Sequence, residues 1–450
     1  MRRIVRLACL GGLAAIATVG AVSACSSDST DSTDPPTPET DGGADVVSPG
    51  TDGGGSDVVV ADQVAPPEDA PVDAGPACTT ASCAIAIGAG PNHTCAVLGD
   101  HTLKCWGDNS HGELGTGSVV GTTVTPSVST KVVAVAGLTD VAAMAGGGEP
   151  GAPGTAFTCV MSTTGAVRCW GSNGYGQLGG ATDAAVSVTP NAVPLDASAS
   201  NVDLGSRHGC VVDTTGALRC WGDNTYGVRG NPALSAIALP TDAGASSVSA
   251  GFFSTCVATK SGEAVCFGNN GNGQVNPYSA AASTPPSIVD AGAPVSAVSA
   301  GQLFVCAAQD ASVSCWGTNQ MGQLGRSGAL ALNLPASVQF TAGIAPVSVQ
   351  AGVNHACAIM ADRGVTCWGA NGRGQSADFS GKTQINSPNG VGGVANVVQL
   401  ALGYEHSCAL LASGEIYCWG SNVKGQLGPN GNADGGTDTV AHPDPVKVPL

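Results

Sequence analysis

Apolar residues in this chain are grouped into short runs that come in pairs, with a turn of two or three residues inside each pair. The run at 408–411 is followed by the turn Ala412-Ser413-Gly414 and by a second run at 416–419. Another apolar run, at 397–400, precedes this pair. Paired runs of this length around a turn are typical of antiparallel β-hairpins. Because no helical period occurs after the N-terminal segment, the pattern predicts an all-β fold.

The hairpins belong to a repeat of about 50 residues, and the second run of each pair ends in the tripeptide Cys-Trp-Gly. All six tryptophans of the chain lie in this tripeptide, and a seventh copy has Phe267 instead. The tripeptide cysteines are Cys105, Cys169, Cys220, Cys266, Cys315, Cys367 and Cys418, and their upstream partners are Cys95, Cys159, Cys210, Cys256, Cys306, Cys357 and Cys408. Repetition at this period indicates a solenoid, a propeller or another repeat array.

The spacing of the two cysteines in each repeat fits directly opposed residues of a hairpin. Nine residues separate them in six copies, around a three-residue loop. The fifth copy has eight, but a two-residue turn at Asp310-Ala311 still places Cys306 opposite Cys315. Directly opposed Cα atoms lie about 4.5–5.5 Å apart, a distance that a disulfide spans. We therefore expect one disulfide per repeat, each stabilising the fold by about 3 kcal/mol in the chain-entropy model.

Two further cysteines, Cys78 and Cys83, lie just before the first repeat, and we expect them to pair with each other. Zinc is the competing interpretation of so many cysteines. Zinc ligands come as close Cys-x-x-Cys or His pairs that converge on one ion, whereas here every pair lies in its own repeat. The sequence therefore favours a disulfide framework and predicts no metal site.

The stretch Cys-Trp-Gly-x-Asn-x-x-Gly-Gln-Leu-Gly resembles the repeat of the regulator of chromosome condensation family. The copies depart from it at Val228-Arg229-Gly230, Val275-Asn276 and Ser376-Ala377. The resemblance covers about residues 84–450 and implies a seven-bladed β-propeller. Four-stranded blades around an axis leave only short sheet edges, and we expect the tryptophans to pack between blades. We also expect residues 84–87 to complete the last blade and so close the ring.

The N-terminal segment differs from the repeats in composition. Three arginines precede an apolar run at 7–22, which predicts a secretory signal peptide over residues 1–24. The following Val22-Ser23-Ala24-Cys25 resembles a bacterial lipobox, which implies cleavage before Cys25 and lipidation of that residue. An ordinary cleavage site and an uncleaved anchor are the alternatives.

Residues 26–77 hold twelve acidic residues and neither lysine nor arginine, and Ser, Thr, Asp, Pro and Gly dominate them. Such a segment cannot bury enough apolar surface to fold. We therefore expect residues 25–77 to be the lipidated cysteine and a disordered acidic tether, followed by the propeller at 78–450.

Charge and motifs restrict the function. The formal net charge is −17, of which residues 78–450 contribute −8 without a basic stripe, so we expect no nucleic-acid partner. The chain has no zinc-protease, serine-hydrolase or phosphate-loop motif, and we expect no catalytic residue and no cofactor. One place in the repeat holds His93, His208, His355 and His406, and Phe157, Ser254 and Phe304 in the other copies. A place that accepts these three residue types indicates packing at the start of a strand.

A partner would contact positions that vary among the repeats. Two such sets flank the hairpin at the end away from its tight turn, so they should converge on one face of the propeller. The candidates on this face are His111, Tyr175, Arg207, Tyr226, Phe252, Phe253, Met321, Arg373, Tyr404 and Lys424. Aromatic residues and arginine dominate binding hot spots, although ordinary exposed loops are the alternative. Repeat two adds a longer loop on the same face, with ten residues instead of two between Gly146 and Phe157.

These observations predict a non-catalytic lipoprotein of the cell envelope whose propeller face binds another protein. We expect an exported monomer that the lipid anchor alone holds to the membrane, at the outer membrane or the cell surface. A carbohydrate-binding or adhesive surface protein is one alternative. An enzyme that acts on envelope polysaccharide through paired carboxylates is another.

Overall fold

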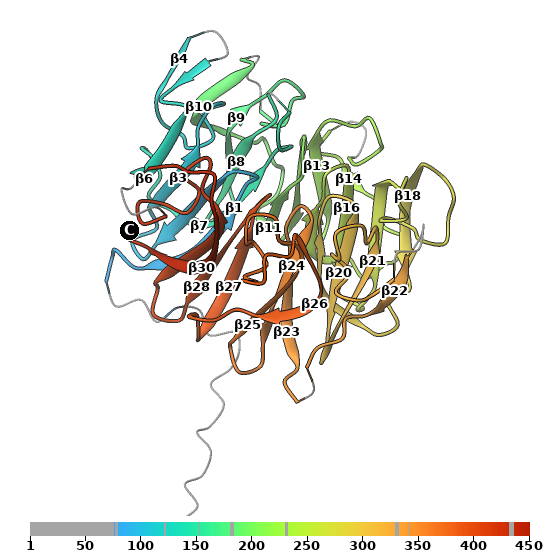
Figure 1. Cartoon of the computed structure of the whole chain (residues 1–450). Helices are drawn as coiled ribbons and strands as arrows, with labels where there is room; N and C mark the ends of the chain where they lie inside the picture. Colours follow the sequence, from blue (N-terminus) through green and yellow to red (C-terminus); the bar gives the residue numbers. More distant parts are fainter. Residues whose placement is uncertain are drawn as a thin grey trace, which may run out of the picture. The chain divides into compact units, whose positions relative to one another are not determined.

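The computed structural model describes residues 76, 80–120, 123–152, 154–180, 184–229, 233–328, 333–341, 343–431 and 436–450 (Figure 1). The predicted signal peptide, the predicted lipidation site at Cys25 and nearly all of the predicted acidic tether lie outside these residues. Among the residues described, no helix is long and apolar enough to cross a membrane.

Seven four-stranded antiparallel sheets form the blades, and each blade is one contiguous stretch of chain. Blade 1 holds β1 (Ala84–Ala89), β2 (His93–Leu98), β3 (Leu103–Asp108) and β6 (Val128–Ala134). Blade 2 holds β7 (Val141–Gly147), β8 (Phe157–Ser162), β9 (Val167–Ser172) and β10 (Val186–Ala192). Blade 3 holds β11 (Ala199–Leu204), β12 (His208–Asp213), β13 (Leu218–Gly222) and β14 (Ala236–Ile237).

The later blades repeat this order. Blade 4 holds β15 (Ala245–Ala250), β16 (Ser254–Thr259), β17 (Ala264–Asn269) and β18 (Ser283–Val289). Blade 5 holds β19 (Val295–Ala300), β20 (Phe304–Gln309), β21 (Ser312–Gly317) and β22 (Asn333–Ser337). Blade 6 holds β23 (Pro346–Ala351), β24 (His355–Met360), β25 (Val365–Ala370) and β26 (Gln384–Gly390), and blade 7 holds β27 (Val397–Leu402), β28 (His406–Leu411), β29 (Ile416–Ser421) and β30 (Ala441–Val448). A two-stranded ribbon, β4 (Ser118–Val120) and β5 (Thr123–Thr125), extends from blade 1.

The first strand of each blade contacts the first strand of the next, and β27 contacts β1, so the seven-bladed ring is closed. The expected mode of closure was wrong, because β1 pairs with β2 inside blade 1 and does not complete blade 7. Contacts between blades 7 and 1 close the ring instead, through backbone hydrogen bonds and through a side chain. Gln399 Oε1 accepts the N–H of Ile87 at 3.0 Å, and Gln399 Nε2 donates to the carbonyl of Ile87 at 2.9 Å.

The predicted disulfide of each repeat is confirmed. All seven cysteine pairs are directly opposed between the second and third strands, for example Cys95 with Cys105, with Cα atoms 4.0–4.1 Å apart. The fifth copy keeps this register because Gln309 pairs with Ser312 across the two-residue turn. Cys83 is also disulfide-bonded, and its expected partner Cys78 lies outside the described residues.

The tryptophans lie between the blades, as expected, and each makes the same hydrogen bond. The indole Nε1–H of every tryptophan donates to a backbone carbonyl of the preceding blade at 2.7–3.0 Å. The acceptors belong to the Gln of the Gly-Gln-Leu-Gly segment, which is Glu113 in repeat one. Phe267 cannot donate, so the junction between blades 3 and 4 lacks this bond. The repeat motif therefore encodes contact between blades.

The four strand-start histidines are buried and form a second contact across the junctions. Each Nε2 lies 2.9–3.0 Å from a Ser or Thr hydroxyl of the following blade, in the pairs His93–Thr158, His208–Thr255, His355–Ser407 and His406–Thr94. In three of them the hydroxyl donates to a carbonyl of the histidine's own blade, as Thr158 does to Glu113. A hydroxyl has one proton to donate, and in these three pairs it goes to the carbonyl. The hydroxyl must therefore accept from the histidine, which assigns the proton of these three histidines to Nε2.

The neutral state of these histidines follows from their burial. Burial lowers the pKa of His93 and His208 to about 4, and that of His355 and His406 to about 3. Two of the three junctions that lack histidine have Phe157 or Phe304, and there the hydroxyl position of the next blade is Gly209 or Ala356. The third junction has the small Ser254, and the corresponding residue of the next blade is Val305. Large and small residues thus alternate across the junctions in a complementary way.

Candidate functional site

The two predicted sets of variable residues do lie at one end of the blades. The loop from the first to the second strand of a blade bonds to the segment that leaves the third strand: Asp108 N donates to Asn92 O at 2.9 Å, and Ser421 N donates to Glu405 O at 2.7 Å. The tight turns between the second and third strands lie at the opposite end. We call the end that carries these two groups of loops the loop face.

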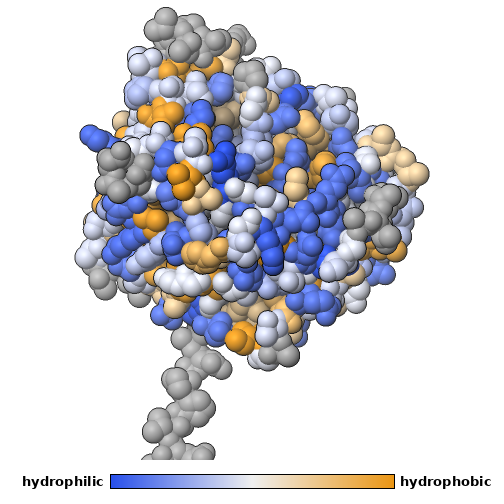
Figure 2. Space-filling model, viewed as in Figure 1, coloured by the Kyte–Doolittle hydropathy of each residue, from blue (hydrophilic) through white to orange (hydrophobic). Residues whose placement is uncertain are grey.

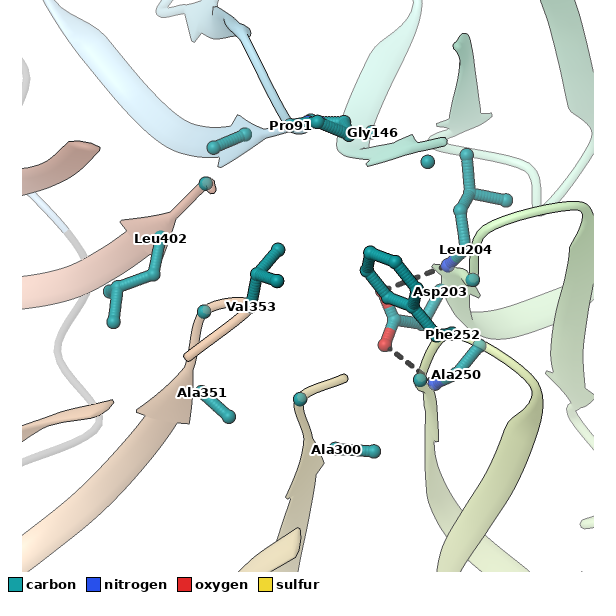
Figure 3. Close-up of a pocket in the computed structure, with 18 of the residues that line it drawn as sticks. Pro91, Gly146, Asp203, Leu204, Ala250, Phe252, Ala300, Ala351, Val353 and Leu402 are labelled. Carbon is teal, nitrogen blue, oxygen red and sulfur yellow. Dashed lines mark hydrogen bonds between the residues drawn. The ribbon is translucent and has the colours of Figure 1, made fainter. Parts of the chain in front are cut away.

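A small axial pocket lies at the centre of this face (Figure 3). It has a volume of about 90 Å³ and is lined mainly by glycine and alanine at the ends of the first strands. Asp203 is its one ionisable lining residue within the described chain. The carboxylate of Asp203 accepts the N–H groups of Leu204 and of Ala250 in the next blade, both at 2.9 Å. Although burial raises the pKa of Asp203 to about 6, these bonds give the carboxylate a structural role.

Five of the ten predicted residues come together from three blades. The guanidinium carbon of Arg207 lies 4.3 Å from the ring centroid of Tyr175 and 5.3 Å from that of Phe253. The ring of Phe253 lies 5.2 Å from Tyr226 and 6.4 Å from Phe252. Contacts of arginine with aromatic faces are favourable cation–π interactions. We call Tyr175, Arg207, Tyr226, Phe252 and Phe253 the arginine–aromatic cluster.

The members of this cluster differ in exposure. Tyr175 is 41% exposed, and Arg207, Tyr226 and Phe253 are partly buried. Phe252 is only 7% exposed, because its ring turns toward the axial pocket (Figure 3). A partner on this surface would therefore contact Tyr175 first, while Phe252 supports the rings above it.

The longer loop of repeat two adds a residue that the sequence reasoning did not select. Glu149 Oε2 lies 2.8 Å from Arg207 Nη2 and fixes the guanidinium between its aromatic neighbours. The loop is held on both sides, because Gly148 N donates to Gly205 O at 3.1 Å and Gly154 N donates to His111 Nε2 at 2.9 Å. The length of the loop was the only indication in the sequence that it carries something specific.

The other predicted residues also lie on the loop face, but outside the cluster. Lys424 Nζ is 3.3 Å from Asp108 Oδ2, and Arg373 Nε is 3.6 Å from Glu405 Oε2. Tyr404 donates its backbone N–H to Pro91 across the ring closure at 2.9 Å. Met321, in blade 5, is 45% exposed. The predicted face is therefore a set of separate groups, with the largest aromatic group over blades 2–4.

A second cavity lies beside the cluster, where blades 7, 1 and 2 meet on the loop face. It has a volume of about 220 Å³, and its ionisable lining residues are Asp108, His111, Glu113, Glu149 and Lys424. We call it the acidic cavity. Glu113 is 1% exposed, and burial, followed by the nearby carboxylate of Asp108, raises its pKa to about 8. Sequence reasoning missed Glu113 because it occupies the glutamine position of the repeat.

Within the chain that the structure describes, no three His, Cys, Asp or Glu side chains are arranged to hold a metal ion. Large apolar side chains are exposed in places, such as Phe379 and Tyr278. In the view of Figure 2, hydrophobic residues are scattered among hydrophilic ones. The arginine–aromatic cluster is defined by the contacts of its rings with one another and with the guanidinium group.

The fold and the loop face define a repeat protein of the seven-bladed β-propeller class, with one repeat in each blade. The kind of repeat follows from comparison with known repeats. The model of the regulator of chromosome condensation (RCC1) repeat matches residues 84–113, 154–177, 199–228, 245–274, 347–375 and 397–426. A second RCC1 repeat model matches residues 310–359. The blades of this chain are therefore built from RCC1 repeats.

Curated relatives share the repeats over part of their length. The mitochondrial RCC1 domain-containing protein RUG3 of Arabidopsis thaliana is 26% identical over 297 residues, which are 61% of this chain and 66% of that protein. The E3 ubiquitin-protein ligase HERC2 of Homo sapiens is 29% identical over 141 residues, which are 31% of this chain and 3% of the ligase. The chain therefore spans less than two thirds of either relative.

Solved structures share the propeller at low identity. Human WBSCR16 matches with a TM-score of 0.66 and 20% identity, over 78% of this chain and 94% of that chain. Prp20p of Saccharomyces cerevisiae, whose structure was studied with its binding to Gsp1p and histones, matches with a TM-score of 0.64 and 18% identity. This match covers 82% of the present chain and 87% of Prp20p. At such identity the likeness establishes the fold alone.

Proposed function

We propose that this propeller is a non-catalytic binding protein whose loop face recognises another protein. The observation that carries the proposal is the arginine–aromatic cluster. Arg207 is held in place by Tyr175, Phe253 and Glu149, so little side-chain entropy remains to be lost on binding. Arginine and aromatic residues that are fixed on a rigid scaffold have the composition of binding hot spots. The yeast propeller Prp20p, which has the same fold, was also studied for its binding to proteins.

We further propose that the chain works outside the cytoplasm as a lipoprotein, tethered through Cys25 and the acidic segment. The N-terminal sequence supports this location, and so do the seven intra-blade disulfides, because such bonds persist in oxidising compartments. Growth of producing cells with a radiolabelled fatty acid tests the anchor. Label should enter the wild-type chain and be absent from Cys25→Ala. Equal labelling of both chains would refute lipidation at Cys25.

A crosslinking pull-down from intact cell envelopes tests the binding face. The tethered wild-type propeller should capture a partner protein, and the double variant Tyr175→Ala/Arg207→Ala should lose it. Met321→Ala is the matched control, because Met321 is also exposed on the loop face but lies in blade 5. Near-ultraviolet circular dichroism must show that all chains are folded. Capture that survives in the double variant, or binding only to glycans on an array, would contradict the proposal.

A further inference from the structure

Three carboxyl groups line the acidic cavity, and two of them form an ion pair with a neighbouring cation. Asp108 is matched by Lys424, whose Nζ lies 3.3 Å away. Glu149 is matched by Arg207 at 2.8 Å. Glu113 has no ion-pair partner among the described residues. The third carboxyl group is therefore buried without a cation.

Comparison among the repeats shows that the scaffold does not need this carboxyl group. Five repeats have glutamine at the same place, and its Oε1 accepts the backbone N–H two residues earlier at 2.7–2.9 Å. In repeat one, Glu113 Oε2 makes this bond with His111 N at 2.7 Å. Where the glutamines carry an amide nitrogen, Glu113 carries Oε1, which accepts no hydrogen bond from another residue that the structure describes, although the backbone N–H of Glu113 itself also stabilises the carboxylate.

A buried, unpaired carboxyl group costs free energy, so its presence at the wall of a cavity indicates a ligand. We propose that the acidic cavity is a receptor for a primary ammonium group, supplied by a lysine side chain of the partner protein. The ammonium group would pair with Glu113 Oε1 as that carboxyl group ionises. A volume of about 220 Å³ is several times the roughly 30 Å³ of a water molecule, which leaves space for an aliphatic chain.

The geometry favours an ammonium group over the other cations of proteins. A guanidinium group is bound best by both oxygens of a carboxylate. Glu113 offers one oxygen, because Oε2 already accepts the N–H of His111. A compact charge with freely rotating donors suits a single oxygen. A metal ion is disfavoured because the described residues include no group of three ligands for one.

Binding of the ammonium group must release a proton. The pKa of Glu113 is raised to about 8 by burial and by Asp108, and Lys424 opposes this rise. His111 and Glu149 are the other ionisable groups at the cavity. Glu113 is therefore neutral at pH 7. When R–NH3+ binds, the Glu113 carboxyl group loses its proton to solvent, and a carboxylate–ammonium pair forms. By linkage, affinity should rise about tenfold per pH unit until the pH approaches the pKa of Glu113.

The inference rests on the proposed function only for the source of the lysine, so a small probe can test the cavity alone. The probe is n-butylammonium chloride, added to the mature chain at up to about 100 mM, a range that detects millimolar affinity. The carbon-13 carboxyl resonance of Glu113 is followed against pH. The pKa of Glu113 should fall by at least about one unit when the probe saturates the site. Tetramethylammonium, which cannot donate a hydrogen bond, is the control probe and should change it little.

Glu113→Gln is the matched variant, because it introduces the residue that five other repeats use at this place and so preserves the fold. It should abolish the pH-dependent binding of n-butylammonium. An unchanged pKa in the wild type, or equal binding by Glu113→Gln, would overturn the inference even if Tyr175→Ala/Arg207→Ala loses the partner. Normal n-butylammonium binding by a chain that captures no partner would count against the proposed function alone.

Discussion

The junctions between the blades and the loop face are built from the same seven repeats, but they use the repeat in opposite ways. At the junctions one solution recurs: an indole of one blade donates to a carbonyl of the previous blade in six of the seven places. On the loop face, one repeat position carries Tyr175, Met321 or Lys424, with different surroundings in each case. The constant positions therefore form the ring, and the variable positions are available for recognition.

Reduction of the disulfides should have the largest effect, and it tests the scaffold side of the comparison. Each of the seven disulfides closes a loop with a sequence separation of 9 or 10 residues, which corresponds to about 3 kcal/mol. Their sum, on the order of 20 kcal/mol, exceeds the usual 5–15 kcal/mol stability of a folded protein. A thiol reductant should therefore abolish the near-ultraviolet circular dichroism of the buried tryptophans without denaturant. A native spectrum after complete reduction would contradict this view.

Acidification should weaken four of the seven junctions. The folded pKa of His208 is about 4, below the 6.5 of an unperturbed histidine, so the unfolded chain binds the proton first. The stability that depends on neutral His208 is complete above pH 6.5 and is lost as the pH falls toward 4, by about 3 kcal/mol. His93, His355 and His406 add to this loss. Urea unfolding curves at several pH values measure the slope.

The double variant His208→Phe/Thr255→Ala sharpens this test. It transfers the Phe304–Ala356 combination of another junction to the junction between blades 3 and 4. The variant should fold and should lose about a quarter of the pH dependence, since one of four histidines is removed. An unchanged slope would show that these histidines do not control acid stability.

Glu113 lies where the junctions and the loop face meet, and Glu113→Gln should stabilise the protein at alkaline pH. The folded pKa of Glu113 is raised from 4.5 to about 8, so the folded state is progressively penalised as the pH rises between these values. Replacement by glutamine removes a penalty of about 3–5 kcal/mol at pH 9. The difference in unfolding free energy between wild type and variant should shrink as the pH is lowered to 5. A difference that is independent of pH would exclude a buried acid as its cause.

Trp316→Phe should cost less, because it copies the natural state of blade 4. The change removes the 3.0 Å bond from Trp316 Nε1 to Gln274 O and leaves the carbonyl buried. We expect a loss of about 1–3 kcal/mol in urea unfolding. Partner capture by the folded variant should be unchanged. Loss of partner capture by a fully folded Trp316→Phe variant would show that the junctions also contribute to binding.

Arg207→Ala should have the smallest effect on stability and a large one on binding. Its ion pair with Glu149 is partly exposed, and such pairs contribute about 0–1 kcal/mol. The thermal midpoint should therefore stay within a few degrees of the wild type, while partner capture is lost. Arg168→Ala is the matched control, because Arg168 has an exposed pair with Asp140 outside the arginine–aromatic cluster.

Much of the scaffold could be predicted from the sequence, because it depends on local register. The cysteine spacing was sufficient for seven disulfides, even where the fifth turn is one residue shorter. The mode of closure could not be predicted in this way. Contacts such as Gln399 with Ile87 depend on which residues meet across the ring, and hairpin register does not specify them. The pairing of histidines with hydroxyls in the next blade was visible only by comparing one repeat with its successor.

The candidate site was predicted in part. Variation among the repeats selected Tyr175, Arg207, Tyr226 and Phe253, which the structure brings together. The burial of Phe252 was not foreseen, since the direction of its ring depends on the width of the axial pocket. Glu113 was overlooked because a single glutamate at the glutamine position of the repeat does not stand out in the sequence. Their hydrogen bonds to the backbone are indeed alike, and only the cavity reveals the difference in charge.

Because every blade is one uninterrupted repeat, the chain termini could lie at any of the junctions between blades. The ends of the propeller lie close together, since Ser82, Cys83, Lys447 and Leu450 line one surface pocket. A circularly permuted chain, with these ends joined and new termini between two other blades, would retain all seven sheets. The architecture is therefore modular at the level of the gene, and new recognition surfaces can arise by exchange of single repeats.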